Sequence, residues 1–379
     1  MVRTLRILTA ILAFMLLVGG AAAGGYLWLQ SEFNATGPSH APLRIEVQEG
    51  ASIRTVLGTL EKQGALRDPR AVEWYVRIER RISGHARRMQ AGTYEIPTNS
   101  SAAQILQMFD QGRVLLEQLT VIEGSRFADL RHTLDTHPAI THALRGKTDA
   151  EVMAAMGHAG EYPEGRFFPD TYRFAARTSD LEILNKAYAA MQAALDSAWQ
   201  SRSPDLPLQN AYEALTLASI VEKETGLPAE RPRIAGVFVA RLRKGMRLQT
   251  DPTVIYGLGA SYDGEIHTRD LVTDTPYNTY TRAGLPPTPI ALPGRESLLA
   301  AVHPQEAGEL YFVATGTGDG GHHFSRTLEE HNLAVKHYLD NLRSTQRGVG
   351  SHAPAASSPG PANGIRSRVP EAQTGSGSR

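Results

Sequence analysis

The segment near the N-terminus restricts the fold of this chain more than any other. Residues 7–29, ILTAILAFMLLVGGAAAGGYLWL, contain no charged side chain. A helix of this length rises about 1.5 Å per residue and is therefore about 35 Å long, enough to cross the roughly 30 Å hydrocarbon core of a membrane. Residues 1–30 are predicted to form a short N-terminus and a single transmembrane helix.

The charges around this segment predict its orientation. Arg3 and Arg6 precede it and no basic cluster follows closely. The positive-inside rule then places the N-terminus in the cytoplasm and the bulk of the chain outside, anchored in the cell (inner) membrane. A cleaved signal peptide is the alternative, because the apolar core 7–18 is followed by GGAAAG. The run YLWL beyond that point favours a retained helix, and both interpretations predict an exported protein.

Composition excludes several classes of protein. The 379 residues give room for two to three domains, and 41% of them are hydrophobic, as in ordinary globular proteins. The formal net charge is zero, which argues against nucleic acid as a partner. The absence of cysteine excludes disulfides and thiolate chemistry.

A strand-turn-helix pattern recurs after a polar tether at residues 31–42. It occupies 43–64 and 117–137, with a weaker copy at 88–112, and polar residues precede each helix as predicted caps: Ser52, Ser100 or Ser101, and Ser125. Units of this kind resemble the LysM-like modules of cell-wall proteins, and residues 43–147 are predicted to form such a subdomain. A rigid spacer without glycan binding is the alternative. The Ser-, Gly- and Pro-rich residues 344–379 are predicted to be a disordered tail.

Residues 148–343 are predicted to form an α+β domain. The expected elements are helices at 180–202, 208–225, 230–245, 295–301 and 328–343, a loop-and-strand stretch at 246–259, a proline-rich segment at 276–294 and a hairpin at 309–327. Strands and helices do not alternate regularly, so a βαβ fold is not expected.

The helix at 208–225 ends on an unusual residue. At about 100° per residue, Glu224 projects between Ile220 and Val221 in the middle of the apolar face, whereas Glu222 projects to the other side. Gly226 follows as a stop signal. Burial and the negative end of the helix dipole both raise the pKa of such a carboxyl group, as a general acid requires.

Glu224 is therefore a candidate catalytic residue. A structural role is the alternative interpretation, because arginines lie just downstream and an ion pair would lower the pKa and make Glu224 a brace. The candidate partners are Arg231, Arg233, Arg241 and Arg243.

The block SIVEKETGLPAERPRIAGVFVARLRKGMRLQTDPTVIYGLG, with FFPDTY before it and YNTYTRAGLPPTPIALPG after it, resembles the endolytic murein transglycosylase family, also called MltG or YceG-like. The resemblance extends from the N-terminal helix to about residue 343. It implies a lytic transglycosylase that cleaves MurNAc–GlcNAc β-1,4 bonds in nascent peptidoglycan, leaves 1,6-anhydro-MurNAc ends and so limits strand length. It also implies that the second Glu of EKE, Glu224, is catalytic. Peptidoglycan synthases are candidate partners, and no cofactor is expected.

Polar residues on expected loops are candidates for substrate binding: Gln249, Asp251, Thr253, Tyr277, Asn278 and Tyr280. Ordinary turn chemistry is the alternative for this set. Two other functions remain open: a non-catalytic wall-binding scaffold that recruits synthesis enzymes, and a metal-dependent hydrolase. The second is disfavoured because the spacing of His303, His322, His323 and His331 matches no helical ligand pattern.

Overall fold

The computed structural model describes residues 2–84 and 87–349. Within these residues, helices are combined with three small two-stranded sheets. The chain divides into two compact units. Unit 1 consists of Met1–Leu119, His137–His142 and Arg173–Asp180, and unit 2 of Thr120–Thr136, Ala143–Tyr172 and Leu181–Arg379.

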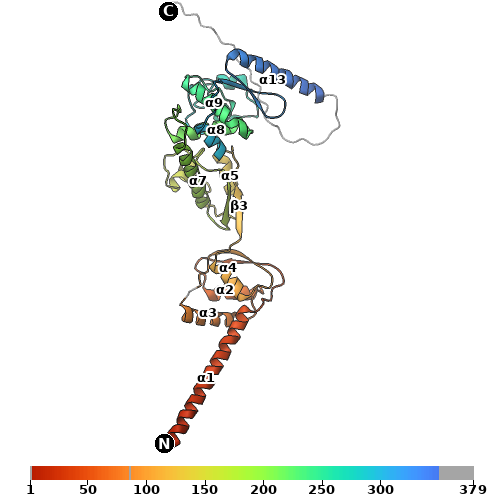
Figure 1. Cartoon of the computed structure of the whole chain (residues 1–379). Coiled ribbons are helices and arrows are strands. Elements are labelled where there is room, and N and C mark those ends of the chain that lie inside the picture. The colour runs from red at the N-terminus through yellow and green to blue at the C-terminus, as the bar shows by residue number, and fades with distance from the viewer. Residues whose placement is uncertain (1, 85–86, 350–379) are drawn as a thin grey trace, which may run out of the picture. The chain divides into compact units, whose positions relative to one another are not determined.

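Unit 1 is built on a two-stranded antiparallel sheet. Strand β1 (Leu43–Val47) pairs with β2 (Gly92–Ile96). The long helix α1 (Val2–Asn34) precedes them, and three shorter helices pack around the sheet: α2 (Ile53–Lys62), α3 (Pro69–Ser83) and α4 (Ala102–Asp110) (Figure 1). α1 is long and apolar enough to cross a membrane.

Local capping explains why two of the recurring units begin their helices where the sequence predicts. The Ser52 side chain accepts a hydrogen bond from the Thr55 amide at the start of α2. Ser101, and not Ser100, caps α4 in a reciprocal capping box with Gln104. The hydroxyl of Ser100 instead donates to the carbonyl of Pro97. The predicted strand-turn-helix units at 43–64 and 88–112 are confirmed.

The strand of the recurring unit at 117–137 does not pair with the strands of the other two units. This strand, β3 (Leu116–Thr120), pairs with β4 (Thr171–Ala175), and the helix of the unit, α5 (Phe127–Thr136), begins two residues after Ser125. The prediction that Ser125 caps this helix is wrong. Its hydroxyl donates to the carbonyl of Ile122, whereas a cap accepts from an amide of the helix.

Unit 2 is centred on helix α8 (Ala211–Glu224). Its residues 214–221 are all buried. The helix packs against α9 (Arg231–Arg243) and α12 (Arg295–Val302), while α7 (Asp180–Gln200) supplies Met191 and Leu195 to the same core (Figure 1). The short helices α6 (Asp149–Ala155) and η1 (Pro228–Glu230) complete this part of the unit.

The stretch expected to be loop and strand is largely a helix, α10 (Asp251–Leu258). The prediction of a loop and strand is wrong because the Asp-Pro pair starts this helix. Pro252 occupies its first turn, where a missing N–H costs nothing and the fixed φ favours the helix. Two short helical segments follow, η2 (Gly259–Ser261) and α11 (Thr268–Val272).

The C-terminal part of unit 2 contains the predicted hairpin. β5 (Tyr311–Ala314) pairs antiparallel with β6 (His322–Ser325). The closing helix α13 (Leu328–Val349) continues six residues beyond the predicted end at residue 343, so the prediction of disorder is wrong for 344–349. The remainder of the predicted tail, 350–379, lies outside the described residues.

Candidate active site around Glu224

Glu224 is the last residue of α8, and the chain turns to an extended conformation at Thr225. The side chain is half-buried. Its Oε2 accepts a hydrogen bond of 2.7 Å from the hydroxyl of Thr250. The carboxyl group is therefore held on one side while the residue keeps some exposed surface.

The surroundings of Glu224 favour its protonated form. Burial raises the pKa of its carboxyl group to about 7, and the negative charge of Asp251 acts in the same direction. The hydrogen bond from Thr250 and the positive charge of Arg241 oppose this shift without cancelling it. A group with a pKa near 7 can both donate and accept a proton near neutral pH.

The arginines downstream of Glu224 bind elsewhere. Among the described residues, none lies within ion-pair distance of its carboxylate, so the brace interpretation is not supported. Arg231 pairs with Glu222, Arg233 with Glu309, Arg243 with Glu306, and Arg241 donates to the backbone carbonyls of Leu248 and Leu310.

Glu222 projects to the other side of α8 from Glu224, but its side chain is buried as well, because α8 is buried on all sides; the prediction that Glu224 alone of the two is carried inward is wrong. The Glu222 side chain is 5% exposed and pairs with the guanidinium of Arg231 at 3.3 Å. Its second oxygen accepts from the amide of Gly294 at 2.9 Å. These contacts favour a structural role for Glu222.

A network of buried threonines fixes Thr250. Its amide donates to the hydroxyl of Thr279 at 3.1 Å, and its carbonyl accepts from the hydroxyl of Thr253 at 2.8 Å. The hydroxyls of Thr253 and Thr279 are 2.9 Å apart. Gln249, which precedes Thr250, is exposed and adopts a φ of 50°.

Sequence reasoning missed Thr250 as a partner of Glu224. The residue occupies the N-cap position of α10, where a threonine hydroxyl normally accepts from an amide of the helix. The Thr250 side chain makes no such capping bond and donates to Glu224 instead. A threonine directly before Asp-Pro predicts a helix cap. The sequence pattern does not show that its hydroxyl donates to a distant glutamate instead.

Asp251 and Tyr280 form a pair beside Glu224. The hydroxyl of Tyr280 donates to Oδ1 of Asp251 at 2.5 Å. Burial raises the pKa of both side chains, and the charge of Asp251 raises that of Tyr280 further. The structure therefore brings together two of the predicted site residues around Glu224.

The other predicted residues occupy different surroundings. Tyr277 is half-buried, and its hydroxyl is 2.8 Å from that of Thr288. Thr253 and Asn278 are buried. The Asn278 amide nitrogen donates to the carbonyls of Asp270, Leu271 and Thr273, and its oxygen accepts from the Tyr280 amide.

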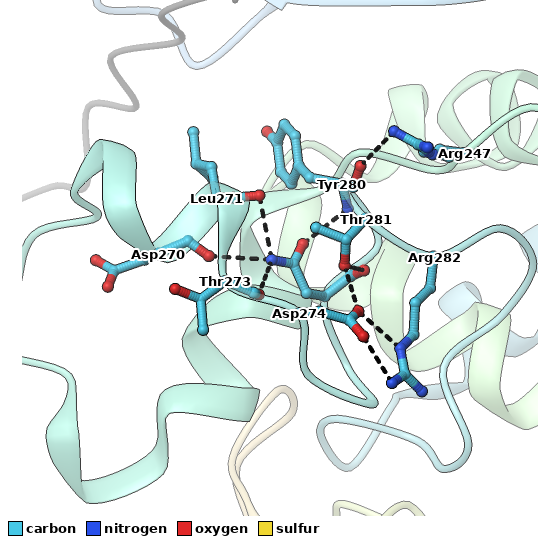
Figure 2. A network of polar contacts seen from close by, with 9 residues as sticks. Arg247, Asp270, Leu271, Thr273, Asp274, Tyr280, Thr281 and Arg282 are labelled. Carbon is cyan, nitrogen blue, oxygen red and sulfur yellow. Dashed lines mark hydrogen bonds and ion pairs between the residues drawn. The ribbon is translucent and has the colours of Figure 1, made fainter.

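Asn278 therefore shapes the loop that carries Tyr280. Figure 2 shows the carbonyls of Asp270 and Leu271 converging on this amide. In the same view Arg282 pairs with Asp274 at 2.8 Å, and Arg247 donates to the carbonyl of Tyr280 at 3.0 Å.

A second buried carboxyl group, Glu164, was missed by sequence reasoning. It is 4% exposed and accepts hydrogen bonds from the amide of Phe127 at 2.9 Å and the hydroxyl of Tyr256 at 3.1 Å. Burial raises its pKa to about 7. Its place at the start of the aromatic stretch EGRFFPDTYRF was the only available signal.

The four histidines considered for a metal site have separate surroundings. His303 contacts Ser201 and Ser203, His322 contacts Glu230 at 2.7 Å, His331 stacks on Tyr311, and His323 is exposed on β6.

A depression of about 420 Å³ in unit 2 is lined by residues 199–209 between α7 and α8, at the other end of α8 from Glu224.

Glu224 is a half-buried carboxyl group with a pKa near 7 and, among the described residues, no arginine ion pair, which suits acid–base chemistry; the carboxyl group of Asp251 lies beside it. The model of the YceG-like family matches residues 45–337 of this chain. The chain therefore belongs to the YceG-like family.

Similar proteins come from several bacteria. A Bacillus subtilis (strain 168) protein named endolytic murein transglycosylase is 30% identical, and the match covers 86% of this chain and 92% of that protein. A Streptococcus pneumoniae (serotype 2, strain D39) protein of the same name is 25% identical over 87% of this chain and 65% of that protein. A crystal structure of a YceG-like protein from Listeria monocytogenes is 30% identical, with a TM-score of 0.49, and covers 77% of this chain and 98% of that one.

Proposed function

We propose that this protein is a membrane-anchored enzyme that cuts peptidoglycan strands internally, with Glu224 as its acid and base. The enzyme class, lytic transglycosylase, follows from the relatives that match most of the chain. The finer proposal is cleavage of the MurNAc–GlcNAc β-1,4 bond in nascent strands, which leaves 1,6-anhydro-MurNAc ends and limits strand length.

One observation carries the proposal. The carboxyl group of Glu224 is bound by the hydroxyl of Thr250 and by no arginine among the described residues, and its pKa lies at about 7. An ion-paired glutamate would stay ionised and could not protonate a leaving group. Glu224 is protonated in part of the molecules at neutral pH, which suits a residue that acts first as an acid.

The lytic reaction needs only this one carboxyl group. Protonated Glu224 gives its proton to the glycosidic oxygen as the bond to C1 of MurNAc breaks, and the GlcNAc-containing part leaves with a new hydroxyl. The C6 hydroxyl of the same MurNAc then forms a bond to C1 and loses its proton to the Glu224 carboxylate. Glu224 ends protonated as it began, and no water is consumed. Hydrolytic glycosidases generally need a second carboxylate for these roles.

Residues near Glu224 are proposed to contact the sugar. Gln249 is exposed, and Asp251, Tyr277 and Tyr280 are half-buried, so their polar groups or ring faces can meet an N-acetyl group or a sugar ring. Thr253 and Asn278 are buried and hydrogen-bonded to their own loops, which favours a role in holding the site together.

The N-terminal parts are proposed to hold the enzyme at its substrate. α1 continues past the candidate cleavage site at residues 19–24, and its Phe33 is 4% exposed within the core of unit 1, which favours a retained anchor over a cleaved signal peptide. The positive-inside rule then places residues 43–343 outside the cytoplasm. The β1–β2 region is proposed to be the LysM-like module, residues 148–343 the catalytic domain, and synthases that make nascent strands the partners.

The test uses the full-length protein in detergent, mixed with freshly polymerised glycan strands, and mass spectrometry of the products. The wild type should release internal fragments with 1,6-anhydro-MurNAc ends, and Glu224→Gln should release none while keeping the wild-type circular dichroism. Products with reducing ends would indicate hydrolysis and point to Asp251 as a second carboxylate. Intact strands with folded wild-type protein would refute the enzyme and favour the wall-binding scaffold.

A further inference from the structure

Helix α3 carries a stripe of exposed residues that faces away from the core of unit 1. Arg70, Trp74, Arg77 and Arg81 are spaced by four, three and four residues and so lie on one side of the helix. All four are exposed, Trp74 at 56%. The guanidinium of Arg77 lies 5.1 Å from the centroid of the Trp74 ring. We refer to these four residues as the α3 stripe.

The α3 stripe is positively charged. The helix contains four arginines and two glutamates, a net charge of 4 − 2 = +2. The glutamates are already occupied, since Glu73 binds Arg54 and Arg77 at 2.9 Å and Glu79 binds Arg87. Among the described residues Arg70 and Arg81 make no ion pair, so their charges are available to an anionic partner.

Contacts with α1 place α3 at a definite level along the apolar helix. The ring of Tyr75 in α3 stacks on Phe33 at 4.4 Å and on Tyr26 at 5.9 Å between ring centroids. Tyr26 lies inside the uncharged segment 7–29, about one turn before its end. Figure 1 shows α3 on the side of unit 1 from which α1 leaves. If α1 spans the membrane, α3 lies at the level where hydrocarbon meets headgroups.

We infer that the α3 stripe lies on the outer surface of the membrane and binds the phosphate groups of anionic phospholipids. The inference rests on the proposed anchoring by α1 and does not depend on the proposed reaction. One guanidinium group can donate two parallel hydrogen bonds to two oxygens of a phosphate. Tryptophan rings are enriched at the membrane–water interface. α1 and α3 together hold unit 1 against the bilayer by two elements instead of one.

Lipid fits this surface better than a protein does. The stripe combines one aromatic ring with three arginines, which is the composition of interfacial helices. It is also continuous with α1, since Tyr75 on the neighbouring face contacts the apolar segment directly. A second copy of the chain would bring the same positive charges together, which Coulomb repulsion disfavours.

The absence of cysteine allows a direct test by site-specific labelling. The full-length Trp74→Cys variant is labelled at residue 74 with an environment-sensitive fluorophore. It is reconstituted into vesicles that contain about 30% phosphatidylglycerol. Lipids spin-labelled at the headgroup quench the fluorophore when it lies at the membrane surface. The matched control is Gln111→Cys, an exposed position at the end of α4. Quenching at residue 74 should exceed that at residue 111 by about threefold or more.

A charge-reversed chain tests the arginines. In the labelled Trp74→Cys chain, the three further changes Arg70→Glu, Arg77→Glu and Arg81→Glu should lower quenching to the level at residue 111. The labelled chain that keeps its arginines should also show less quenching in vesicles of phosphatidylcholine alone. Equal quenching at residues 74 and 111 overturns the inference. Equal quenching with and without anionic lipid overturns the phosphate contact, and cross-linking of two labelled copies without quenching identifies a second copy instead.

Retention of the chain after alkaline extraction is measured in the same vesicles. Loss of the chain overturns the anchor and the α3 contact together, whereas retention without quenching overturns the α3 contact alone. Cleavage of glycan strands is assayed separately, so an inactive but quenched protein refutes the proposed reaction and leaves the membrane contact supported.

Discussion

The hydroxyl of Thr250 donates a 2.7 Å hydrogen bond to Oε2 of Glu224, joining the N-cap position of α10 to the last residue of α8. The bond fixes one carboxylate oxygen, and Oε1 accepts no hydrogen bond from the residues that the structure describes. It also stabilises the ionised carboxylate and so lowers the pKa of Glu224 against the larger effect of burial. The position of the proton on the candidate catalytic group therefore depends on one hydroxyl group from another helix.

Thr250→Val should slow the reaction and move its pH dependence. Valine keeps the shape of threonine but removes the donor, so Glu224 loses its orientation and its pKa rises above about 7. We expect kcat to fall about tenfold. The alkaline limb of the pH–rate profile should move to higher pH, because the acid stays protonated longer. Thr250→Ser, which restores the donor, should recover both; a profile identical to the wild type in the valine variant would contradict the role of this bond.

Asp251→Asn should move the same limb in the opposite direction. The charge of Asp251 raises the pKa of Glu224, so its removal lowers that pKa and the acid is lost at lower pH. The Asn side chain can still accept the hydrogen bond from Tyr280, which preserves the local geometry. The measurement is the pH dependence of anhydro-end formation for both variants side by side. Shifts of the same sign in the two variants would refute this electrostatic assignment.

Glu222→Gln should affect stability far more than catalysis. The change leaves the Arg231 guanidinium, 10% exposed, without its ion-pair partner, which we expect to cost about 3 kcal/mol of unfolding free energy. Activity per folded molecule should stay within about twofold of the wild type, because Glu222 lies on the far side of α8 from Glu224. Glu306→Gln is the control, since its ion pair with Arg243 is more exposed and contributes about 1 kcal/mol or less. A folded but inactive Glu222→Gln protein would show that both glutamates act in the reaction.

The stability of the protein should fall between about pH 5 and pH 8 because of Glu164. Burial raises the pKa of Glu164 from 4.5 to about 7 in the folded state. The folded protein therefore holds a proton that the unfolded chain has released, and stability present below about pH 4.5 is lost as the pH rises through about 7.

Glu164→Gln removes this titration. Over the same interval the wild type should lose roughly 2 kcal/mol more unfolding free energy than the variant. Denaturant unfolding at both pH values measures the difference. Parallel pH dependences in the two proteins would show that Glu164 titrates at its ordinary pKa in the folded state.

Short-range patterns predicted much of this fold correctly. Apolar periodicity predicted α7, α8, α9 and α12, and small polar residues before a helix predicted the caps Ser52 and Ser101, because hydrogen bonds within a few residues decide these features. The prediction failed where a local signal had two uses. Asp251-Pro252 was expected in a loop but begins helix α10. Ser125 was expected to cap a helix, but its hydroxyl donates to the carbonyl of Ile122.

The sequence by itself determined that Glu222 and Glu224 project to different sides of α8, since both residues belong to one helix of known pitch. It did not predict that the side chain of Glu222 is buried as well, at 5% exposed. Only the tertiary structure decided what surrounds the carboxyl group of Glu224. Thr250 is 26 residues away, and the arginines that could have neutralised Glu224 find other partners across the fold. Such contacts depend on how the loop of Asn278 and the helix α10 pack, and no pattern within one segment records that packing.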